Sequence, residues 1–317
     1  MPDLDQTVSR LAANRHGVVV ATITGDDVTV RGTAGLGATT RFEIGSITKV
    51  FTALALARLA LTGRAALDEP LRDLLPAGTS CPPSITLRHL ATHTSGLPRL
   101  PPGMLRGALL NPFQPDPYAH CTERYLLAAL GRARLRSAPG RRFHYSNFGA
   151  GLLGLALAHR AGLPYDDLVR REIPGLLCTS TAGVATPGHK RNGRPAAPWN
   201  LAALAGAGGL RSTAADMASF VQAHWRPTSE LAPAVDLALS IEHRVNPFLT
   251  AHLGWMSRRL HPKQGGHQQF FHNGGTGGFV SFAAFDPQRR VGVVALSDTQ
   301  RSVDGPAFEL LTSLQSA

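Results

Sequence analysis

The residues best suited to covalent chemistry lie near the start of the chain, in the segment Phe42 to Lys49 (FEIGSITK). Ser46 precedes Lys49 by three residues, and an apolar run from Val50 to Leu61 follows, so we expect both side chains at the start of one helix. Residues three apart share a helix face, which lets the Lys49 amine reach the Ser46 hydroxyl. Burial and the positive end of the helix both favour a neutral amine, which would activate the serine to attack a carbonyl.

This Ser-x-x-Lys spacing is not specific by itself, because Ser46 could simply cap the helix while Lys49 is solvated. Two further segments add weight to the chemical interpretation. Tyr145 to Asn147 lies in a loop that runs into a second apolar helix, and His272 to Gly275 lies at the end of a predicted strand. Taken alone, Tyr145 would be read as a buried tyrosine at a helix start. The three segments together favour a shared catalytic site.

The elements that must position these residues begin and end the chain as strands. The β-branched segments Gly17 to Thr24 and Val28 to Gly32, separated by a turn, predict a hairpin. Gln268 to His272, Phe279 to Phe285 and Arg290 to Leu296 predict three antiparallel strands, with turns rich in glycine or containing Asp-Pro between them.

The middle of the chain is predicted to be helical. The periodic segments are Ile47 to Leu61, Leu67 to Leu75, Leu87 to Ala91, Glu123 to Leu130, Gly149 to Ala161, Tyr165 to Arg171 and Ala214 to His224. We therefore predict an α/β fold of the α+β type, in which both chain ends build one antiparallel sheet flanked by helices. A single domain, 1–317, would divide into a sheet lobe (about 1–62 and 205–317) and a mainly helical lobe (about 63–204). The active-site cleft would lie between them, with the Pro-rich loop Pro98 to Pro117 in its wall.

Composition excludes several classes of protein. The 317 residues carry a formal charge of +11, but the arginines are scattered, so a nucleic-acid partner is not expected. Cys81, Cys121 and Cys178 are an odd number at wide spacing and suggest neither a disulfide framework nor a zinc site. The first residues do not resemble a signal peptide, and no apolar run is long enough to span a membrane. We expect a cytoplasmic enzyme without a membrane partner, and the oligomeric state stays open.

The three motifs together resemble those of the serine β-lactamase and penicillin-binding protein superfamily. Two connecting segments also resemble that superfamily: Ile85 to Pro98 (ITLRHLATHTSGLP) and Gly208 to Asp216 (GGLRSTAAD). The Tyr-x-Asn form of the second motif is similar to the class C β-lactamase-like esterase branch, and the resemblance covers nearly the whole chain. It implies the β-lactamase/transpeptidase-like fold.

The resemblance also implies roles for individual residues. Ser46 matches the acylated nucleophile, Lys49 the group that accepts its proton or holds the proton network, and Tyr145 the second general base and acid. Whether Lys49 or Tyr145 deprotonates Ser46 stays open, because coupled groups share their titration. The remaining roles are substrate binding by Asn147, which also orients Lys49, and by His272, Asn273 and Gly274, with an oxyanion hole formed by the N–H groups of Ser46 and Gly275. His272 stands where β-lactamases usually carry a lysine that recognises the substrate carboxylate, which argues against a dedicated β-lactamase.

The predicted function is a serine hydrolase that takes an ester or amide acyl group from a small molecule or peptide onto Ser46. The alternatives are an acyltransferase or peptide cyclase that passes the acyl group to an amine or alcohol, a D-amino-acid peptidase or amidase, a weak β-lactamase, and, least favoured, an idle ligand-binding protein. No cofactor is expected. His89 and His93 are spaced to share a metal if both are helical, but the glutamate of HExxH is missing, and we expect no metal. A direct role for Arg211 is not favoured.

Overall fold

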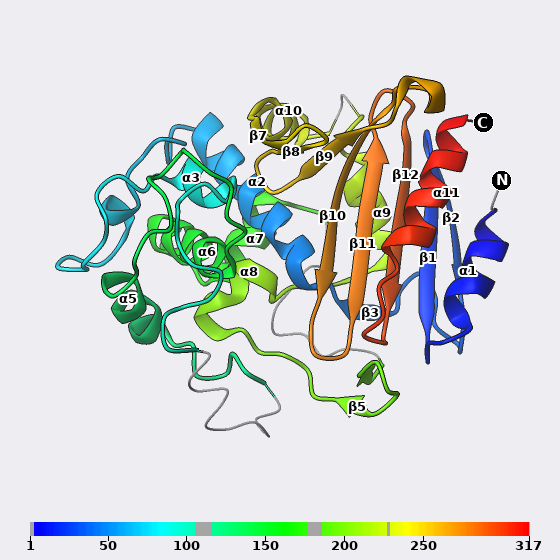
Figure 1. The fold of residues 1–317 in the computed structure, drawn as a ribbon, viewed down its shortest axis with the longest axis horizontal. Coiled ribbons are helices and arrows are strands. Elements are labelled where there is room, and N and C mark those ends of the chain that lie inside the picture. The colour runs from blue at the N-terminus through cyan, green and yellow to red at the C-terminus, as the bar shows by residue number, and fades with distance from the viewer. Residues whose placement is uncertain (1–2, 105–115, 176–185, 227–228, 317) are drawn as a thin grey trace.

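An eight-stranded antiparallel sheet forms the centre of the protein. In Figure 1 its strands β10, β11, β12, β1 and β2 lie side by side from the centre to the right. The computed structural model describes residues 3–104, 116–175, 186–226 and 229–316. The strand order is β2-β1-β12-β11-β10-β9-β8-β7. In chain order these strands are β1 (Val18–Thr24), β2 (Asp27–Gly32), β7 (His243–Asn246), β8 (Leu249–Ala251), β9 (Met256–Arg259), β10 (Gln268–Gly275), β11 (Val280–Asp286) and β12 (Val291–Ser297).

The two ends of the chain meet in this sheet, as the sequence predicted. β1 pairs with β12 along its whole length, from Val18 opposite Ser297 to Thr24 opposite Val291. β10 continues to Gly275, three residues past the predicted end at His272, because its last residues still pair with β11. This extension carries the glycines of the third motif into the sheet.

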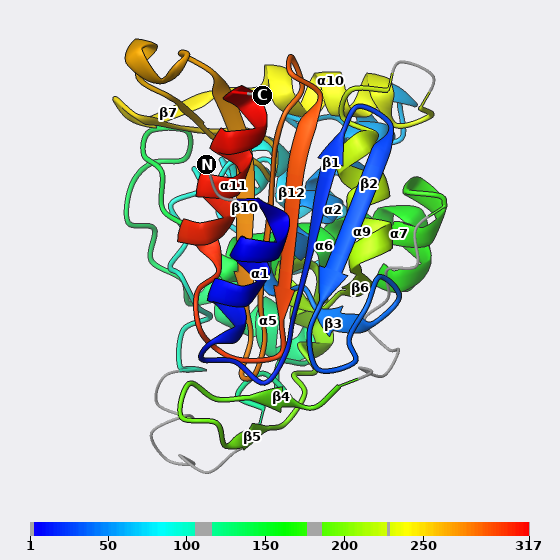
Figure 2. The same ribbon diagram turned by 90° about the vertical axis from the view of Figure 1, so that its right-hand side faces the viewer.

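Helices cover both faces of the sheet. Figure 2 shows α1 (Leu4–Ala12) and α11 (Asp304–Ser316) lying across the outer face, where their apolar sides bury Val18 and Val20 of β1. Against the inner face pack α2 (Thr48–Leu61), α9 (Ala214–Gln222) and α10 (Ala232–Ser240). Every residue of β12 is buried because both of its faces are covered.

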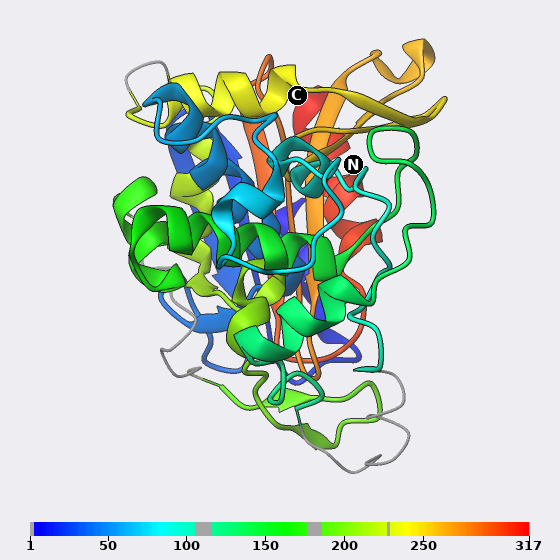
Figure 3. The same ribbon diagram turned by 90° about the vertical axis from the view of Figure 1, so that its left-hand side faces the viewer.

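The helical body lies beyond α2, in front of the sheet in Figure 3. It contains α3 (Leu87–Ala91), α5 (Glu123–Gly131), α6 (Asn147–Ala161), α7 (Tyr165–Glu172), α8 (Ala205–Gly208) and the 3-10 turns η2 (Leu71–Leu74) and η3 (Ala202–Leu204). The predicted helix Leu67 to Leu75 is wrong: apart from η2 it is not helical. Pro70 is extended and bridges Thr86, and a proline both lacks an N–H and disfavours helix at the preceding residue.

The remaining elements are small. β3 (Arg41–Glu43) pairs with β6 (Arg211–Thr213), and β4 (Gly188–His189) pairs with β5 (Pro195–Ala196). The 3-10 turns η1 (Gly45–Ile47) and η4 (Pro262–Gln264) complete the set. Among the helices of the described ranges, none combines the length and apolar character needed to cross a membrane.

Candidate active site

Ser46 lies in η1, between β3 and α2, and is partly exposed while its neighbours in the turn are buried. Gly45 has a φ of +48°, and a Cβ at this position would lie only 2.6 Å from the backbone nitrogen of Gly275. Glycine is therefore needed for the turn to approach the end of β10. This approach brings together the two segments whose N–H groups the resemblance assigns to the oxyanion hole.

Lys49 occupies the first turn of α2 and is buried. Its Nζ donates to Ser46 Oγ at 2.9 Å and to the carbonyl oxygen of Ala207, in α8, at 2.5 Å. Burial lowers the pKa of Lys49, the charge of Arg99 lowers it further, and the nearby Tyr145 phenol opposes the change. A buried amine with a lowered pKa can exist in the neutral form that accepts a proton from a serine.

Tyr145 comes directly before α6, and its ring lies close to Lys49. The distance from Lys49 Nζ to the ring centroid is 5.0 Å, while the guanidinium carbon of Arg99 lies 5.3 Å from the same centroid. The helix start behind Tyr145 is fixed by Ser146, whose Oγ accepts the N–H of Gly149 at 2.8 Å and donates to the carbonyl of Pro98 at 2.7 Å. Ser46, Lys49 and Tyr145, nearly 100 residues apart in the chain, thus form one cluster.

His93 holds the Tyr145 segment from behind, a role that the sequence did not indicate. Its ring lies 4.5 Å from the Tyr145 ring, its Nδ1 accepts the N–H of Ser146 at 3.2 Å, and its carbonyl accepts the N–H of His144 at 2.7 Å. The backbone of His93 has a φ of +58°. Burial, with Lys49 and His272 nearby, holds the pKa of His93 well below its usual value, so the neutral imidazole can serve as an acceptor.

His89 and His93 do not share one helix face, because α3 ends at Ala91. His89 Nδ1 instead accepts the N–H of Thr86 and closes a capping box at the start of α3. No group of three or more His, Cys, Asp or Glu side chains that could hold a metal is found within the described ranges.

Asn147 begins α6, and its backbone N–H donates to the carbonyl of Arg99 at 2.9 Å. Its side-chain Oδ1 is buried and has no hydrogen-bond partner among the described residues. Burial raises the pKa of the Tyr118 phenol, and a hydrogen bond with Asn147 partly opposes this rise. Such a buried amide oxygen can accept a hydrogen bond from a further donor.

His272, in β10, is buried and lies near Tyr145, with 6.5 Å between the ring centroids. Its Nδ1 donates to the carbonyl of Asn273 at 2.6 Å, which leaves Nε2 as an acceptor. Burial, with Lys49 nearby, lowers the pKa of His272 to about 3. At neutral pH this residue is therefore uncharged and does not replace the cation that a lysine would supply.

The other residues of the third motif divide between the two faces of the sheet. The Asn273 side chain points to the outer face, where Nδ2 donates to Asp304 Oδ2 at 2.7 Å, so the structure does not bring it to Ser46. A Cβ at Gly274 would lie 2.1 Å from the carbonyl oxygen of Ile44, so a side chain there would push η1 away from β10. The strand thus contributes His272 and the glycine backbone to the site.

A buried ion pair between Glu43 and Arg211 lies next to the turn that carries Ser46. Glu43 Oε1 accepts the backbone N–H of Trp199 at 2.9 Å and lies 3.4 Å from a guanidinium nitrogen of Arg211 on the paired strand β6. Burial raises the pKa of Glu43, against the opposing effects of its hydrogen bonds and of Arg211. Arg211 therefore acts on the site through β3, and neither residue of this pair was predicted to have such a role.

The predicted loop Pro98 to Pro117 contributes its ends to the site, while residues 105–115 lie outside the described residues. Arg99, near its start, lies over Tyr145. Tyr118, just after its end, packs against Trp199 with 5.0 Å between the ring centroids.

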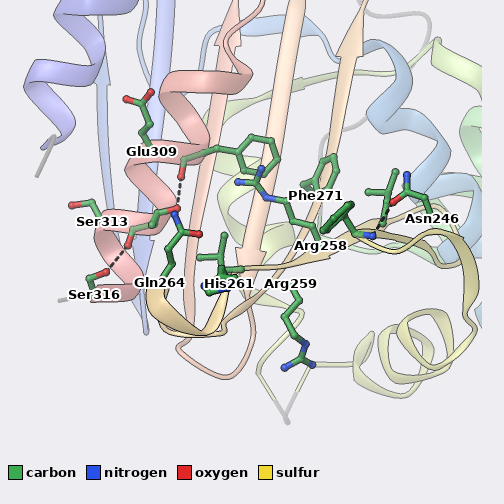
Figure 4. Close-up of a pocket in the computed structure, with 14 residues that line it drawn as sticks. Asn246, Arg258, Arg259, His261, Gln264, Phe271, Glu309, Ser313 and Ser316 are labelled. Carbon is green, nitrogen blue, oxygen red and sulfur yellow. Dashed lines mark hydrogen bonds between the residues drawn. The ribbon is translucent and has the colours of Figure 1, made fainter.

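A cavity of about 790 Å³ lies elsewhere, between α11 and the strands β7 to β9. Figure 4 shows its lining side chains, among them Arg258, His261, Phe271 and Glu309. It shares no residue with the Ser46 cluster. Because nothing in its lining pairs a nucleophile with a base, size alone does not mark it as the catalytic site.

The chain as a whole is similar to known proteins. A family model described as "Beta-lactamase" matches residues 4–312. The D-alanyl-D-alanine-carboxypeptidase/endopeptidase AmpH of Escherichia coli (strain K12) is 32% identical over 274 residues, which cover 79% of this chain and 69% of AmpH. The solved β-lactamase/D-alanine carboxypeptidase from Pseudomonas syringae has a TM-score of 0.81 at 21% identity, covering 99% of this chain and 98% of that one. A D-stereospecific amidohydrolase from Streptomyces sp. has a TM-score of 0.80 at 22% identity, covering 98% of both chains.

Proposed function

The chain belongs to the β-lactamase family of serine hydrolases, and we propose that it takes the acyl group of an ester or amide onto Ser46 as a covalent intermediate and releases it to water. The observation that carries this proposal is the 2.9 Å contact between the buried Lys49 amine and Ser46 Oγ. A buried lysine of lowered pKa, in hydrogen-bond contact with a partly exposed serine, has the arrangement of an activated nucleophile.

Acylation would proceed through three proton transfers. Neutral Lys49 accepts the hydroxyl proton as Ser46 Oγ attacks the carbonyl carbon, and the N–H groups of Ser46 and Gly275 stabilise the oxyanion. Tyr145 delivers a proton to the leaving nitrogen or oxygen as its bond to the carbonyl breaks, and recovers a proton from Lys49. For deacylation the same groups remove a proton from water as its oxygen attacks the carbonyl carbon of the Ser46 ester. They return a proton to Ser46 Oγ as its bond to that carbon breaks, which frees the acid.

The surroundings of the cluster bear on the substrate. Asn147 offers a buried amide oxygen to the acyl side chain, and the uncharged His272 leaves the strand side of the site without a cation. The related AmpH is a D-alanyl-D-alanine carboxypeptidase/endopeptidase, and the Streptomyces enzyme of similar fold is an amidohydrolase. We include short peptides and amides, together with esters, in the proposed substrate class.

The direct test is labelling with a fluorophosphonate probe, read by intact-protein mass spectrometry. We expect one adduct per chain, lost in Ser46→Ala. Ser240→Ala serves as the matched control, because Ser240 is an exposed serine at the end of α10. An adduct that persists in Ser46→Ala, or that disappears in Ser240→Ala, would refute the assignment.

The acceptor of the acyl group is tested separately. Acyl esters are supplied with and without an amine or alcohol acceptor, and the products are identified by mass spectrometry. Free acid as the product in both conditions supports a hydrolase. A new amide or ester, lost in Ser46→Ala, would instead assign an acyltransferase that uses the same acyl-enzyme.

A further inference from the structure

Arg99 places an exposed positive charge at the edge of the Ser46 cluster. Its guanidinium carbon lies 5.3 Å from the Tyr145 ring centroid. The positive charge of Arg99 favours a lower pKa for both Lys49 and Tyr118. Within the described residues Arg99 forms no ion pair, and the segments outside them contain no Asp or Glu. A guanidinium that faces a catalytic tyrosine without a carboxylate partner is available to an anion from solution.

The backbone fixes this arginine relative to the catalytic residues. The carbonyl oxygen of Arg99 accepts the N–H groups of Asn147 at 2.9 Å and Phe148 at 3.2 Å, in the first turn of α6. The carbonyl of Pro98 accepts the Ser146 hydroxyl at 2.7 Å. Arg99 and Tyr145 therefore belong to one hydrogen-bonded unit, and the guanidinium is held near the group that would protonate the leaving atom.

The other basic groups of the site are unsuited to bind an anion. Lys49 is buried, bonded to Ser46 and Ala207, and its pKa is lowered by burial. His272 and His93 are buried and neutral for the same reason. A guanidinium keeps its charge at all working pH values. Among the residues that the structure describes, Arg99 is thus the cation of this cluster that can meet a substrate.

Building on the proposed function, we propose that Arg99 is a specificity-determining residue that binds a carboxylate on the leaving-group side of the acyl donor. The substrate class is then an ester or amide whose leaving group carries a carboxylate, such as a peptide cleaved next to its C-terminal residue. The guanidinium offers two parallel N–H groups that match the two carboxylate oxygens. The anion recognition that relatives assign to a lysine in the third motif has, in this chain, moved to the loop that begins at Pro98.

The test uses matched donors that differ in one charge: the acetyl ester of 3-hydroxybenzoate and the acetyl ester of its methyl ester. The readout is the ratio of kcat/KM for the anionic donor to that for the neutral donor. Charge-assisted hydrogen bonds of this kind correspond to a preference of about tenfold. We expect the ratio to fall about tenfold in Arg99→Gln and to be partly retained in Arg99→Lys.

Arg244→Gln is the matched control, because it removes the same charge from an exposed position on the edge strand β7. We expect it to leave the ratio unchanged. A second measurement needs no variant: raising the ionic strength should reduce the preference of the wild-type protein, because the guanidinium is exposed. A third donor, the phenyl monoester of succinic acid, carries its carboxylate on the acyl side and should gain nothing from Arg99.

An unchanged ratio in Arg99→Gln, or a larger effect on the succinate monoester than on the hydroxybenzoate ester, would overturn the proposal. Failure of the underlying function looks different: hydrolysis would then persist in Ser46→Ala. Fluorophosphonate labelling of Arg99→Gln shows that the variant is folded and that its serine still reacts, so the ratio judges the role of Arg99 alone.

Discussion

The inner and outer faces of the central sheet both carry clusters of polar and basic side chains, but they are built differently. On the inner face Lys49 and His272 are buried, and burial lowers their pKa values. On the outer face Arg258 lies 3.6 Å from the Phe308 ring centroid and donates to Gln269 at 2.8 Å. The outer face has the 790 Å³ cavity, but within the described residues it is the inner face that places a buried amine of lowered pKa 2.9 Å from a serine hydroxyl. The arrangement of buried titratable groups, and not the volume of a cavity, therefore indicates where the catalytic site lies.

The largest effect is expected when the buried amine of the inner face is removed. Lys49→Met keeps an unbranched side chain of similar length but removes the amine, so kcat/KM should fall on the order of 10³-fold. Thermal stability should hold or rise, because a buried amine no longer has to be desolvated. Arg258→Met on the outer face is the matched control. Equal losses in the two variants would show that the inner face has no special role.

The second variant tests the proton relay on the inner face. Tyr145→Phe keeps the ring that packs against His93 but removes the phenol, so kcat/KM should fall about 10²-fold while the fold is kept. Circular dichroism checks the fold and steady-state kinetics the rate. Activity within a few fold of wild type would exclude Tyr145 as the group that protonates the leaving atom.

A third prediction concerns acid stability. His224 is buried, its Nδ1 donates to Phe220 and its Nε2 accepts from Trp255, and burial lowers its pKa to about 4. Between pH 6.5 and about 4 the folded state therefore binds fewer protons than the unfolded state, so stability falls as the pH falls through this window.

His224→Gln removes this titration and should flatten the dependence of the free energy of unfolding on pH by about 1.4 kcal/mol per pH unit. Urea denaturation at several pH values measures it. The same slope in the variant and in wild type would show that His224 is not the group responsible.

The smallest effect is expected from a neighbour of His272 on the other face. Asn273→Ala removes one exposed hydrogen bond to Asp304, which should cost about 0.5 kcal/mol of stability and change kcat/KM by less than about twofold. Enzyme kinetics and thermal denaturation of the one variant give both values. A large loss of activity would return Asn273 to the substrate-binding role that the motif predicted.

Much of the framework was predictable from local signals. The terminal hairpin, the three C-terminal strands and the helices that carry Lys49 and Asn147 follow from β-branched runs and apolar periodicity. The short helices and edge strands between Ala232 and Arg259 were not predicted, because they carry weak periodicity and depend on packing against α2 and β10. The helix at Leu67 to Leu75 failed where Pro70 outweighed the apolar pattern.

The site was predictable only in part. The position of Asn273 could have been inferred from the alternation of side chains along a strand, had β10 been extended beyond His272. No nearby residue indicated the role of His93, because its hydrogen bond to Ser146 joins residues 53 positions apart in the chain. Its positive φ also places its backbone outside the helical conformation. Arg99 likewise becomes part of the cluster only through the contact between its carbonyl and the start of α6.

The sequence by itself determined the residue types of the three motifs, their order, and the elements that hold them, because hydrogen bonding within a helix or hairpin depends on nearby residues. Only the tertiary structure decided which basic groups are buried, with lowered pKa values, and which are exposed. The pKa values of Lys49 and His272 and the exposure of Arg99 depend on burial and on charges brought from distant parts of the chain. Such contacts join distant segments of the chain, as where the turn at Gly45 approaches Gly275 at the end of β10.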